Sequence, residues 1–292
     1  MVYITGDTHG QYPDIRDRVK FNNLTKDDVL IVLGDFGANF YMTLRDNGFK
    51  GKCDRLGPTI FAIHGNHEAR PETISSYKTK EWKGGIVYYE EDYPNILFAK
   101  DGEIYDFDGK SVFVCGGAYS VDKYYRAFRA ALYGYVNIPT EIFSKLEILV
   151  HNGTLSAEDK KVVDKYLNKL PSGLLAWWKD EQPPATTKKH CEDVLTQHNW
   201  KVDIVLTHTS PEKYEPTEMF LEGLNQDNVD KKTEKWLNKI EKKLDYKKWY
   251  AGHYHTNKPV NDKFQFLYED VQVLDIPKNI IKEENVQENT ER

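Results

Sequence analysis

The amino-acid sequence predicts an α/β fold with two β-sheets and a helical insert. Three observations support this prediction. Near the amino terminus, short apolar runs alternate with a helical stretch, an order typical of a parallel sheet. Between residues 86 and 115, short strand-like segments follow one another with only turns between them. A long segment with helical spacing then separates these strands from a last group that begins near residue 203.

The first part of the chain contains three largely apolar runs, each closed by a glycine. They are residues 2–5, 29–33 and 59–63. A helical stretch near Pro13 to Lys20 separates the first two. Apolar runs of this length without polar alternation are typical of strands that are buried on both faces. We therefore expect these strands to share a mainly parallel sheet.

The next group of strands is shorter and interrupted more often. We expect strands at residues 86–89, 95–99, 103–107 and 111–115, with Pro, Asp and Gly between them. The Asp108-Gly109 pair between the last two is a typical hairpin turn. The pattern predicts an antiparallel meander that forms a second sheet.

Residues 127–175 are expected to form a helical insert. Apolar residues recur at helical spacing over 142–150 and again over 162–170, with Asn152-Gly153 ending the first run. The pattern predicts two helices packed as a hairpin. The insert could act as a lid or as a surface for a partner, and an insertion without such a role is an equally good interpretation.

The last part of the chain returns to strands. We expect strands at 203–207 and 248–251, a charged amphipathic helix over 229–244, and two short strands within 264–276. The chain is therefore divided into a core of residues 1–126 and 176–276, the insert at 127–175, and a polar tail at 277–292.

Composition excludes several classes of protein. The chain has 292 residues, of which 39% are hydrophobic and 13% aromatic, so it can bury a sizeable core and is not wholly disordered. The net charge of −6 argues against a protein that holds extended nucleic acid through its phosphates. A small nucleic-acid substrate stays open, because a metal ion can supply positive charge locally.

The same composition sets the expected location. No run approaches the roughly 18 apolar residues of a membrane span, so we expect no membrane partner. The amino terminus lacks the features of a signal peptide, and the three cysteines lie far apart. We therefore expect a cytoplasmic protein with reduced thiols.

Five segments share one pattern: a strand, then a glycine or polar break, then side chains of the types that bind metals. The segments are Gly6-Asp7-Thr8-His9-Gly10, Gly34-Asp35, Gly65-Asn66-His67-Glu68, Thr207-His208 and Gly252-His253-Tyr254-His255. Each follows the carboxyl end of a predicted strand. In an open α/β sheet these ends meet at one edge, where ligands bind. We therefore expect the five segments to bring their side chains into one crevice.

The residue types suggest which ions the crevice would hold. Mixed imidazole and carboxylate ligands favour Zn, Fe, Mn or Ni over Ca or Mg. Asp7 and His9 lie two residues apart, as do His253 and His255, so an extended backbone would point both members of a pair the same way. One ion does not need all the candidates, but two ions sharing a carboxylate, roughly 3.5–4 Å apart, would use them. The candidate ligands are Asp7, His9, Asp35, Asn66, His208, His253 and His255.

Each segment is weak evidence by itself, because short motifs arise by chance. A lone Asp-x-His or His-x-His is more often an exposed pair, and a lone Gly-Asp is more often a turn. The four defined residues of Gly65-Asn66-His67-Glu68 are more specific. The prediction of a shared metal site depends on the occurrence of all five segments in this order, each after a predicted strand.

With these motifs the sequence resembles the calcineurin-like metallophosphoesterases over about residues 2–255. The resemblance implies a four-layer αββα sandwich of two mixed β-sheets flanked by helices, with a two-metal site at the sheet edge. The first and third motifs are similar to the Ser/Thr and diadenosine-tetraphosphate phosphatase branch, although Gly34-Asp35-Phe36-Gly37 lacks the further Asp-Arg-Gly of that branch. The closing Gly252-His253-x-His255 is similar to the phosphodiesterase and Mre11-type branches. Residues 116–123 and 177–183 are similar to small bacterial and phage-type members.

The resemblance also implies a role for each motif residue. One ion would be held by Asp7, His9, Asp35 and His255, and the other by Asp35, Asn66, His208 and His253. A water or hydroxide bridging the ions would attack phosphorus in line. His67 would be the general acid beside the leaving oxygen, and Glu68 would orient its ring. Asn66 and Arg70 are the expected substrate contacts, although a surface ion pair is an equally good interpretation of Arg70.

The sequence therefore predicts a metal-dependent phosphoesterase, similar to a protein phosphatase or a nucleotide phosphodiesterase. We expect two divalent ions, Mn²⁺ first, with Fe, Zn or Ni as alternatives. The substrate would be a small phosphorylated compound or nucleotide, or a phosphoprotein. One alternative is an Mre11-like DNA nuclease, which the acidic composition disfavours. The other is a catalytically inactive interaction scaffold, which the complete ligand set disfavours.

Weaker candidates follow the strand at 111–115 and the insert. Tyr119, Lys123 and Arg126 could reach a substrate, but a solvated loop is the preferred interpretation of the two basic residues. Trp177 and Trp178 could stack on a base, but packing is the preferred interpretation of paired tryptophans.

Overall fold

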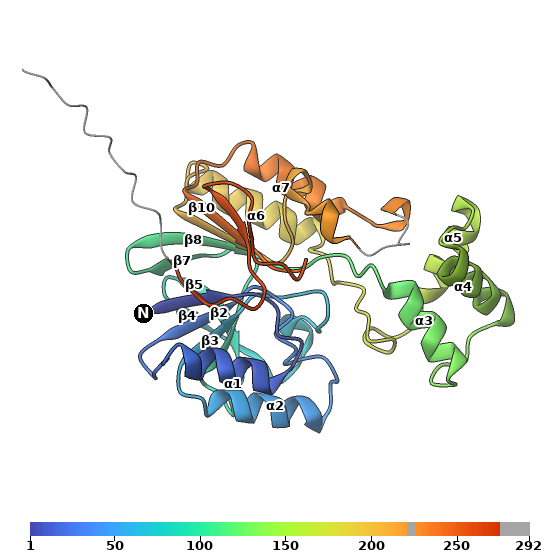
Figure 1. The fold of residues 1–292 in the computed structure, drawn as a ribbon, viewed down its shortest axis with the longest axis horizontal. Coiled ribbons are helices and arrows are strands. Elements are labelled where there is room, and N and C mark those ends of the chain that lie inside the picture. Colours follow the sequence, from blue (N-terminus) through green and yellow to red (C-terminus); the bar gives the residue numbers. More distant parts are fainter. Residues whose placement is uncertain (221–225, 275–292) are drawn as a thin grey trace, which may run out of the picture.

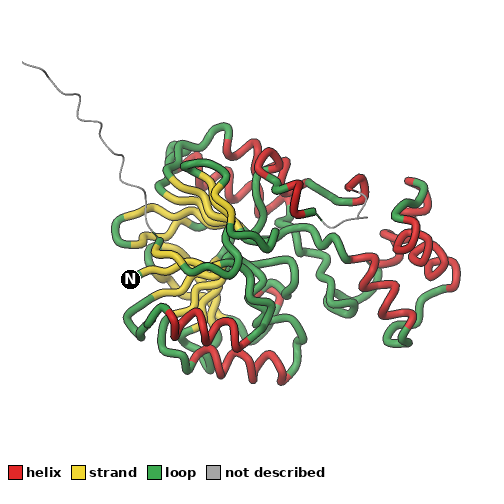
Figure 2. The backbone as a smooth tube through the Cα atoms, in the orientation of Figure 1, coloured by secondary structure: helices red, strands yellow, loops and turns green. Residues whose placement is uncertain are grey.

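The computed structural model describes residues 1–220 and 226–274. These residues form two stacked β-sheets with helices on both outer faces, and three further helices project from one side (Figure 1). Figure 2 shows the layers in the order helix, sheet, sheet, helix. The expected four-layer αββα sandwich is therefore confirmed.

The first sheet has seven strands in the order β13-β1-β2-β3-β6-β5-β4. Their bounds are β1 Val2–Thr5, β2 Val29–Val32, β3 Thr59–Ala62, β4 Lys78–Trp82, β5 Gly85–Tyr89, β6 Ile96–Ala99 and β13 Gln272–Val273. β1, β2, β3 and β6 are parallel, and β13, β5 and β4 are antiparallel to their neighbours. All residues of β1 and β2 are buried, as expected for inner parallel strands.

The second sheet has six strands in the order β11-β12-β10-β9-β8-β7. Their bounds are β7 Ile104–Phe107, β8 Lys110–Cys115, β9 Ile204–Thr207, β10 Lys248–Ala251, β11 Lys258–Pro259 and β12 Phe264–Phe266. β12, β10, β9 and β8 are parallel, and the two edge strands are antiparallel.

The predicted antiparallel meander is divided between the two sheets, so its assignment to the second sheet alone is wrong. β5 and β6 belong to the first sheet, where β6 pairs in parallel with β3. β7 and β8 form the predicted hairpin in the second sheet. The reason is burial: every residue of β6 is buried, which suits an inner strand between β3 and β5 in a sheet that is covered on both faces.

Helices cover the outer face of each sheet. α1 (Tyr12–Phe21) and α2 (Leu44–Asp54) pack on the first sheet, and α6 (Ala185–Gln197) and α7 (Lys232–Glu241) pack on the second (Figure 1). Short 3-10 turns occur at η1 Pro71–Thr73, η2 Glu212–Tyr214, η3 Thr217–Met219 and η4 Gln226–Asn228. None of the helices within the described ranges has the length and apolar character needed to cross a membrane.

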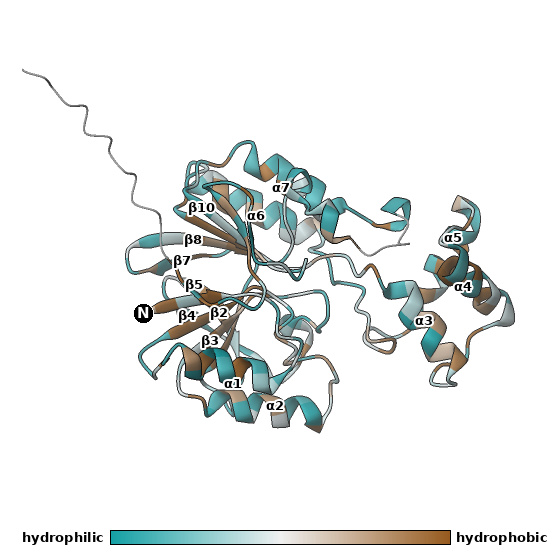
Figure 3. Cartoon of the chain, viewed as in Figure 1, coloured by the Kyte–Doolittle hydropathy of each residue, from teal (hydrophilic) through white to brown (hydrophobic). Residues whose placement is uncertain are grey.

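Apolar side chains fill the spaces between the layers. Between the sheets, Phe61 of β3 packs with Tyr105 of β7 and Leu206 of β9 in one cluster. Separate clusters lie under the helices of each outer layer. Figure 3 shows hydrophobic strands at the centre and hydrophilic residues on the outer helix faces. Each fully buried large side chain contributes about 1.5–3 kcal/mol, so the sheets form a rigid support for the loops at their edge.

The insert is built from α3 (Lys123–Leu132), α4 (Thr140–Asn152) and α5 (Ala157–Leu167). The predicted helix hairpin, α4 and α5, is confirmed, and α3 precedes it. These helices have an apolar cluster of their own, which extends to Tyr124 and Trp177, just outside the predicted limits of 127–175. Trp177 and Trp178 are both buried, which confirms that they pack. The division into domains stays a prediction, and the predicted tail at 277–292 lies outside the described residues.

Candidate metal centre

The five metal-type segments lie together at one edge of the sandwich. They follow β1, β2, β3, β9 and β10, which are parallel within each sheet. The carboxyl ends of these strands lie on the side from which the insert projects (Figure 1). Side chains from the first ten residues and from the loop after β10 therefore meet.

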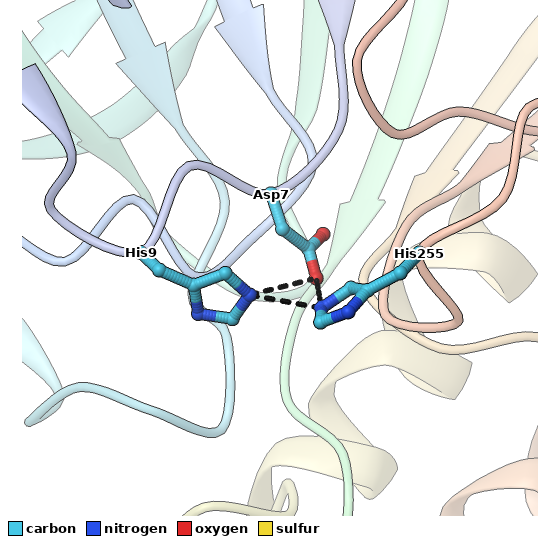
Figure 4. Close-up of side chains that lie close together, drawn as sticks. All are labelled: Asp7, His9 and His255. Atoms are coloured by element: carbon cyan, nitrogen blue, oxygen red, sulfur yellow. Dashed lines mark hydrogen bonds and ion pairs between the residues drawn. The ribbon is translucent and has the colours of Figure 1, made fainter. Parts of the chain in front are cut away.

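Asp7, His9 and His255 form the first group of candidate ligands, and their side chains point toward one another (Figure 4). Nε2 of His255 lies 3.4 Å from Oδ2 of Asp7, and Nε2 of His9 lies 3.9 Å from the same oxygen. The two imidazole nitrogens are 2.8 Å apart. One atom from each residue is therefore placed to face a single ion.

Asp7, Asp35 and His208 form the second group, and all three are buried. Nε2 of His208 lies 3.6 Å from Oδ2 of Asp35, and its Nδ1 lies 3.9 Å from Oδ1 of Asp7. Oδ1 of Asn66 lies 2.8 Å from Nε2 of His208. The ring of His253 lies beside that of His208, with centroids 4.9 Å apart. All seven candidate ligands are therefore at or beside the two groups.

Asp35 belongs to the second group and also approaches His9 of the first group. Its Oδ2 is 3.6 Å from Nε2 of His208 and 3.8 Å from Nδ1 of His9. Its Oδ1 accepts a hydrogen bond of 2.8 Å from the backbone N–H of His67, which orients the carboxylate. A carboxylate oxygen in this place suits a ligand that bridges two ions.

Two observations show that these side chains fit divalent cations. Oδ2 of Asp7 is buried and accepts no hydrogen bond from the described residues. Nδ1 of His208 donates to the carbonyl oxygen of Leu33 at 2.8 Å, so a neutral His208 ring would carry its lone pair on Nε2. That lone pair faces Oδ1 of Asn66, whose amide nitrogen donates to Ser120 at 3.0 Å. Acceptors that face one another without a proton between them are typical of groups around a metal ion.

Burial and neighbouring charges set the ionisation of the ligands. Burial by itself raises the pKa of Asp7, but the imidazoles of His208 and His255 outweigh it and hold this pKa below its usual value. The pKa of Asp35 is lowered in the same way, against burial, chiefly by His208. Burial lowers the pKa of His253 to about 3. The centre therefore presents ionised carboxylates and a neutral imidazole, the forms in which these groups bind metals.

Several of the ligands lie on strained backbone. His9, Asp35, His253 and His255 have φ values of 47°, 46°, 69° and 50°, in the left-handed region that residues other than glycine rarely adopt. The extended backbone expected for both pairs of ligands is therefore wrong. Turns, and not alternation along a strand, direct these side chains inward. Such strained conformations cluster at functional sites, where the surrounding structure imposes them.

Gly34 allows β2 to approach the loop that carries His208. A Cβ atom on Gly34 would lie 2.1 Å from Nδ1 of His208, and its φ is +95°. We expect Gly34→Ala to displace His208 and weaken Mn²⁺ binding at least roughly tenfold, measured by calorimetry. Gly84→Ala is the control, because Gly84 has a φ of +80° and nothing within 4 Å of the added Cβ. Equal Mn²⁺ affinity in the two variants would contradict this role of Gly34.

His67 lies beside the centre. Its Nδ1 is 2.7 Å from Nη2 of Arg126. Because a guanidinium only donates hydrogen bonds, Nδ1 accepts and the neutral ring carries its proton on Nε2. That nitrogen lies 4.0 Å from Oδ2 of Asp35, so the proton is on the side of the centre. Burial lowers the pKa of His67, which favours the neutral ring.

Glu68 does not orient the ring of His67, contrary to the role that the family resemblance implies. Its carboxylate accepts hydrogen bonds from the backbone N–H groups of Gly37 at 3.1 Å and Gly65 at 3.3 Å. Burial raises the pKa of Glu68 to about 8. Within the described residues, Glu68 forms no hydrogen bond with the imidazole of His67, and Arg126 makes the orienting contact. Glu68 instead holds together the loops that follow β2 and β3.

Arg70 contacts residues that are not candidate ligands. Its guanidinium donates to Oδ2 of Asp101 and to the carbonyl oxygen of Asp180, both at 2.7 Å. The ion pair is buried, so the interpretation as a surface pair is wrong. Arg70 lines neither of the two cavities described below, and its contact with a phosphate stays a prediction.

The contact between Arg126 and His67 is the feature that sequence reasoning missed. A solvated loop was the preferred interpretation of Lys123 and Arg126, but both lie in α3, where Lys123 is buried and pairs with Asp164 at 2.8 Å. Arg126 pairs with Asp122 at 2.6 Å, four residues earlier. That spacing is visible in the sequence and indicates a helix.

Two cavities adjoin the centre and meet there. His67 and His255 line both of them. The first has a volume of about 450 Å³ and is also lined by Asp35 and Asn66. The second has a volume of about 430 Å³ and is also lined by His9. Each is large enough for part of a small-molecule substrate.

The chain is similar to one known family and to solved structures. A sequence model described as calcineurin-like phosphoesterase matches residues 1–257. The crystal structure of TT1561 of Thermus thermophilus is 11% identical, with a TM-score of 0.43, over 91% of this chain and 87% of that chain. A second solved structure is 13% identical, with a TM-score of 0.38, over 91% and 88% of the two chains. No curated protein matches the sequence.

Proposed function

The chain belongs to the calcineurin-like phosphoesterase family, and from this premise we propose that it hydrolyses phosphoric esters with two divalent metal ions. The observation that carries the proposal is the convergence of two groups of ligands on Asp35, with His67 beside them. The substrates we propose are small phosphorylated compounds or nucleotides, with a phosphoprotein as a further candidate. We propose the cytoplasm as the place where it acts.

The two groups of side chains suggest how the ions would be held. One ion would be bound by Asp7, His9, Asp35 and His255, and the other by Asp35, Asn66, His208 and His253. When bound, such ions neutralise the phosphoryl oxygens and lower the pKa of the water that attacks phosphorus. We expect Mn²⁺, with Fe, Zn or Ni as alternatives, because the set mixes imidazoles with carboxylates.

His67 supports departure of the leaving group in this proposal. In the neutral ring, Nε2–H donates a hydrogen bond to the leaving oxygen and stabilises the charge that develops there as the P–O bond breaks. Arg126 holds Nδ1 and so keeps this proton on the side of the centre. Complete transfer of a proton requires the doubly protonated ring, and for that Arg126 has to release Nδ1. Asp122 pairs with Arg126, so it could hold the guanidinium after Arg126 has moved away from Nδ1 of His67.

Metal-dependent hydrolysis of chromogenic esters tests the proposal. The protein should release p-nitrophenol from p-nitrophenyl phosphate or from bis(p-nitrophenyl) phosphate when Mn²⁺ is present. EDTA should abolish the release and excess Mn²⁺ should restore it, because the ligands by themselves lack the charge that stabilises the reacting phosphoryl group.

Two other results would contradict the proposal. If neither ester is hydrolysed with Mn, Fe, Zn or Ni, the inactive scaffold becomes the better interpretation. If the protein binds DNA tightly and the binding weakens steeply with salt, the nuclease becomes the better interpretation.

A further inference from the structure

The two cavities at the centre differ in their chemistry, and this difference bears on the substrate. We call the cavity of about 450 Å³ the apolar cavity, after Tyr119, Phe220 and Tyr254 in its wall. We call the cavity of about 430 Å³ the arginine cavity, after Arg45 and Arg126. Because His67 and His255 line both, a phosphorus atom at the centre would have one cavity on each side.

The apolar cavity suits an aromatic substituent. The rings of Phe220 and Tyr254 are nearly parallel, at 19°, with centroids 6.3 Å apart. Flat aromatic groups pack well against such rings. The charged groups of this cavity do not favour an anion: Glu215 pairs with Lys231 at 2.6 Å, and Glu234 is buried with one carboxylate oxygen that has no partner among the described residues.

The arginine cavity suits an anionic substituent. The guanidinium of Arg45 lies 3.8 Å from the centre of the Tyr41 ring, and no carboxylate of the described residues pairs with it. Asp46, the acid in this cavity, accepts hydrogen bonds from the backbone N–H groups of Tyr41 and Met42. The charge of Arg45 is therefore available to a ligand, and arginine binds phosphate oxygens well.

We propose that the substrate is a phosphodiester that spans the centre, with an aromatic substituent in the apolar cavity and a substituent bearing a second negative charge in the arginine cavity. The inference rests on the proposed function and narrows it. Hydrolysis would break the P–O bond to one substituent and form a P–O bond to water. The products would be a phosphomonoester and an alcohol, whose oxygen takes up the proton. A monoester of similar size would fill one cavity and leave the other to solvent.

Three chromogenic probes test this proposal in the presence of Mn²⁺. They are p-nitrophenyl phosphate, the p-nitrophenyl ester of thymidine 5′-phosphate, and the same ester with an added 3′-phosphate. We expect kcat/KM to rise at least about tenfold from the first to the second and again from the second to the third. Hydrolysis of the monoester at a rate equal to or above that of both diesters would overturn the inference and leave the proposed function standing. No hydrolysis of any probe would overturn both.

Variants in each cavity, with matched controls, make the test specific. Arg45→Ala should bring the ratio of kcat/KM between the diesters with and without the 3′-phosphate close to one. Phe220→Ala should raise the KM of both diesters. Arg16→Ala and Phe21→Ala are the controls, because Arg16 pairs with Asp17 on the surface and Phe21 is 81% exposed. Equal ratios in Arg45→Ala and Arg16→Ala would overturn the assignment of the arginine cavity.

Binding to the metal-free protein gives a readout that does not depend on turnover. With EDTA present, calorimetry should show the 3′-phosphorylated diester binding about tenfold more tightly to the unchanged protein than to Arg45→Ala. The Arg16→Ala control should bind like the unchanged protein. Equal affinity in all three would overturn the inference even if the enzyme hydrolyses phosphoric esters.

Discussion

Replacement of His67 by alanine will lower turnover about 10²–10⁴-fold and leave Mn²⁺ uptake unchanged. The reason is its position: Nε2 faces the centre, but His67 belongs to neither group of ligands. The alanine variant loses the hydrogen bond to the leaving oxygen and keeps every proposed ligand. Turnover is measured with p-nitrophenyl esters, and Mn²⁺ uptake by calorimetry.

A comparison of leaving groups sharpens this prediction. The fall in turnover caused by His67→Ala should be larger for a phenyl ester than for the p-nitrophenyl ester. Phenol has the higher pKa, so its departure depends more on a hydrogen-bond donor at the leaving oxygen. His198→Ala is the control, since His198 is exposed at the end of α6. If His67→Ala also loses its Mn²⁺, His67 is a ligand and the role given to it here is wrong.

Replacement of Asp35 by asparagine will remove both turnover and tight metal binding. Oδ2 of Asp35 approaches both His208 of its own group and His9 of the other group, and its charge is the one that both ions would share. We expect Mn²⁺ affinity to fall by more than the roughly 10–100-fold that changes around a metal site typically cause. Mn²⁺ should then raise the melting temperature of the variant less than that of the unchanged protein, because binding to the folded state stabilises it.

Asparagine is preferred to alanine here because it can keep the backbone contact. Its side-chain oxygen can still accept the hydrogen bond from the N–H of His67, so the loop after β3 keeps its anchor. The control is Asp27→Asn, an exposed carboxylate near the other end of β2. Undiminished Mn²⁺ binding by Asp35→Asn would show that Asp35 does not bridge two ions.

The parts of the fold that could be predicted depend on neighbours along the chain. Apolar runs closed by glycine predicted β1, β2 and β3, and helical spacing predicted α4 and α5. The strands between residues 86 and 115 were predicted, but β5 and β6 were assigned to the wrong sheet. The partner of β6 is β3, more than thirty residues earlier in the chain, and no local pattern distinguishes this partner from β7.

The side chains that could form a metal centre are recognisable from the order of residues, because each lies just after a strand and the carboxyl ends of parallel strands meet at one edge. The surroundings of that centre, in contrast, depend on contacts between residues that are distant in the sequence. Arg126 contacts His67 only because α3 begins close to the loop that follows β3. Glu68 accepts hydrogen bonds from two loops and, within the described ranges, makes no contact of this kind with His67. The two cavities are likewise made by loops distant in sequence. Contacts of this kind join particular residues of separate layers. Hydrophobic periodicity shows which face of an element is buried, but it does not show which distant residue that face contacts.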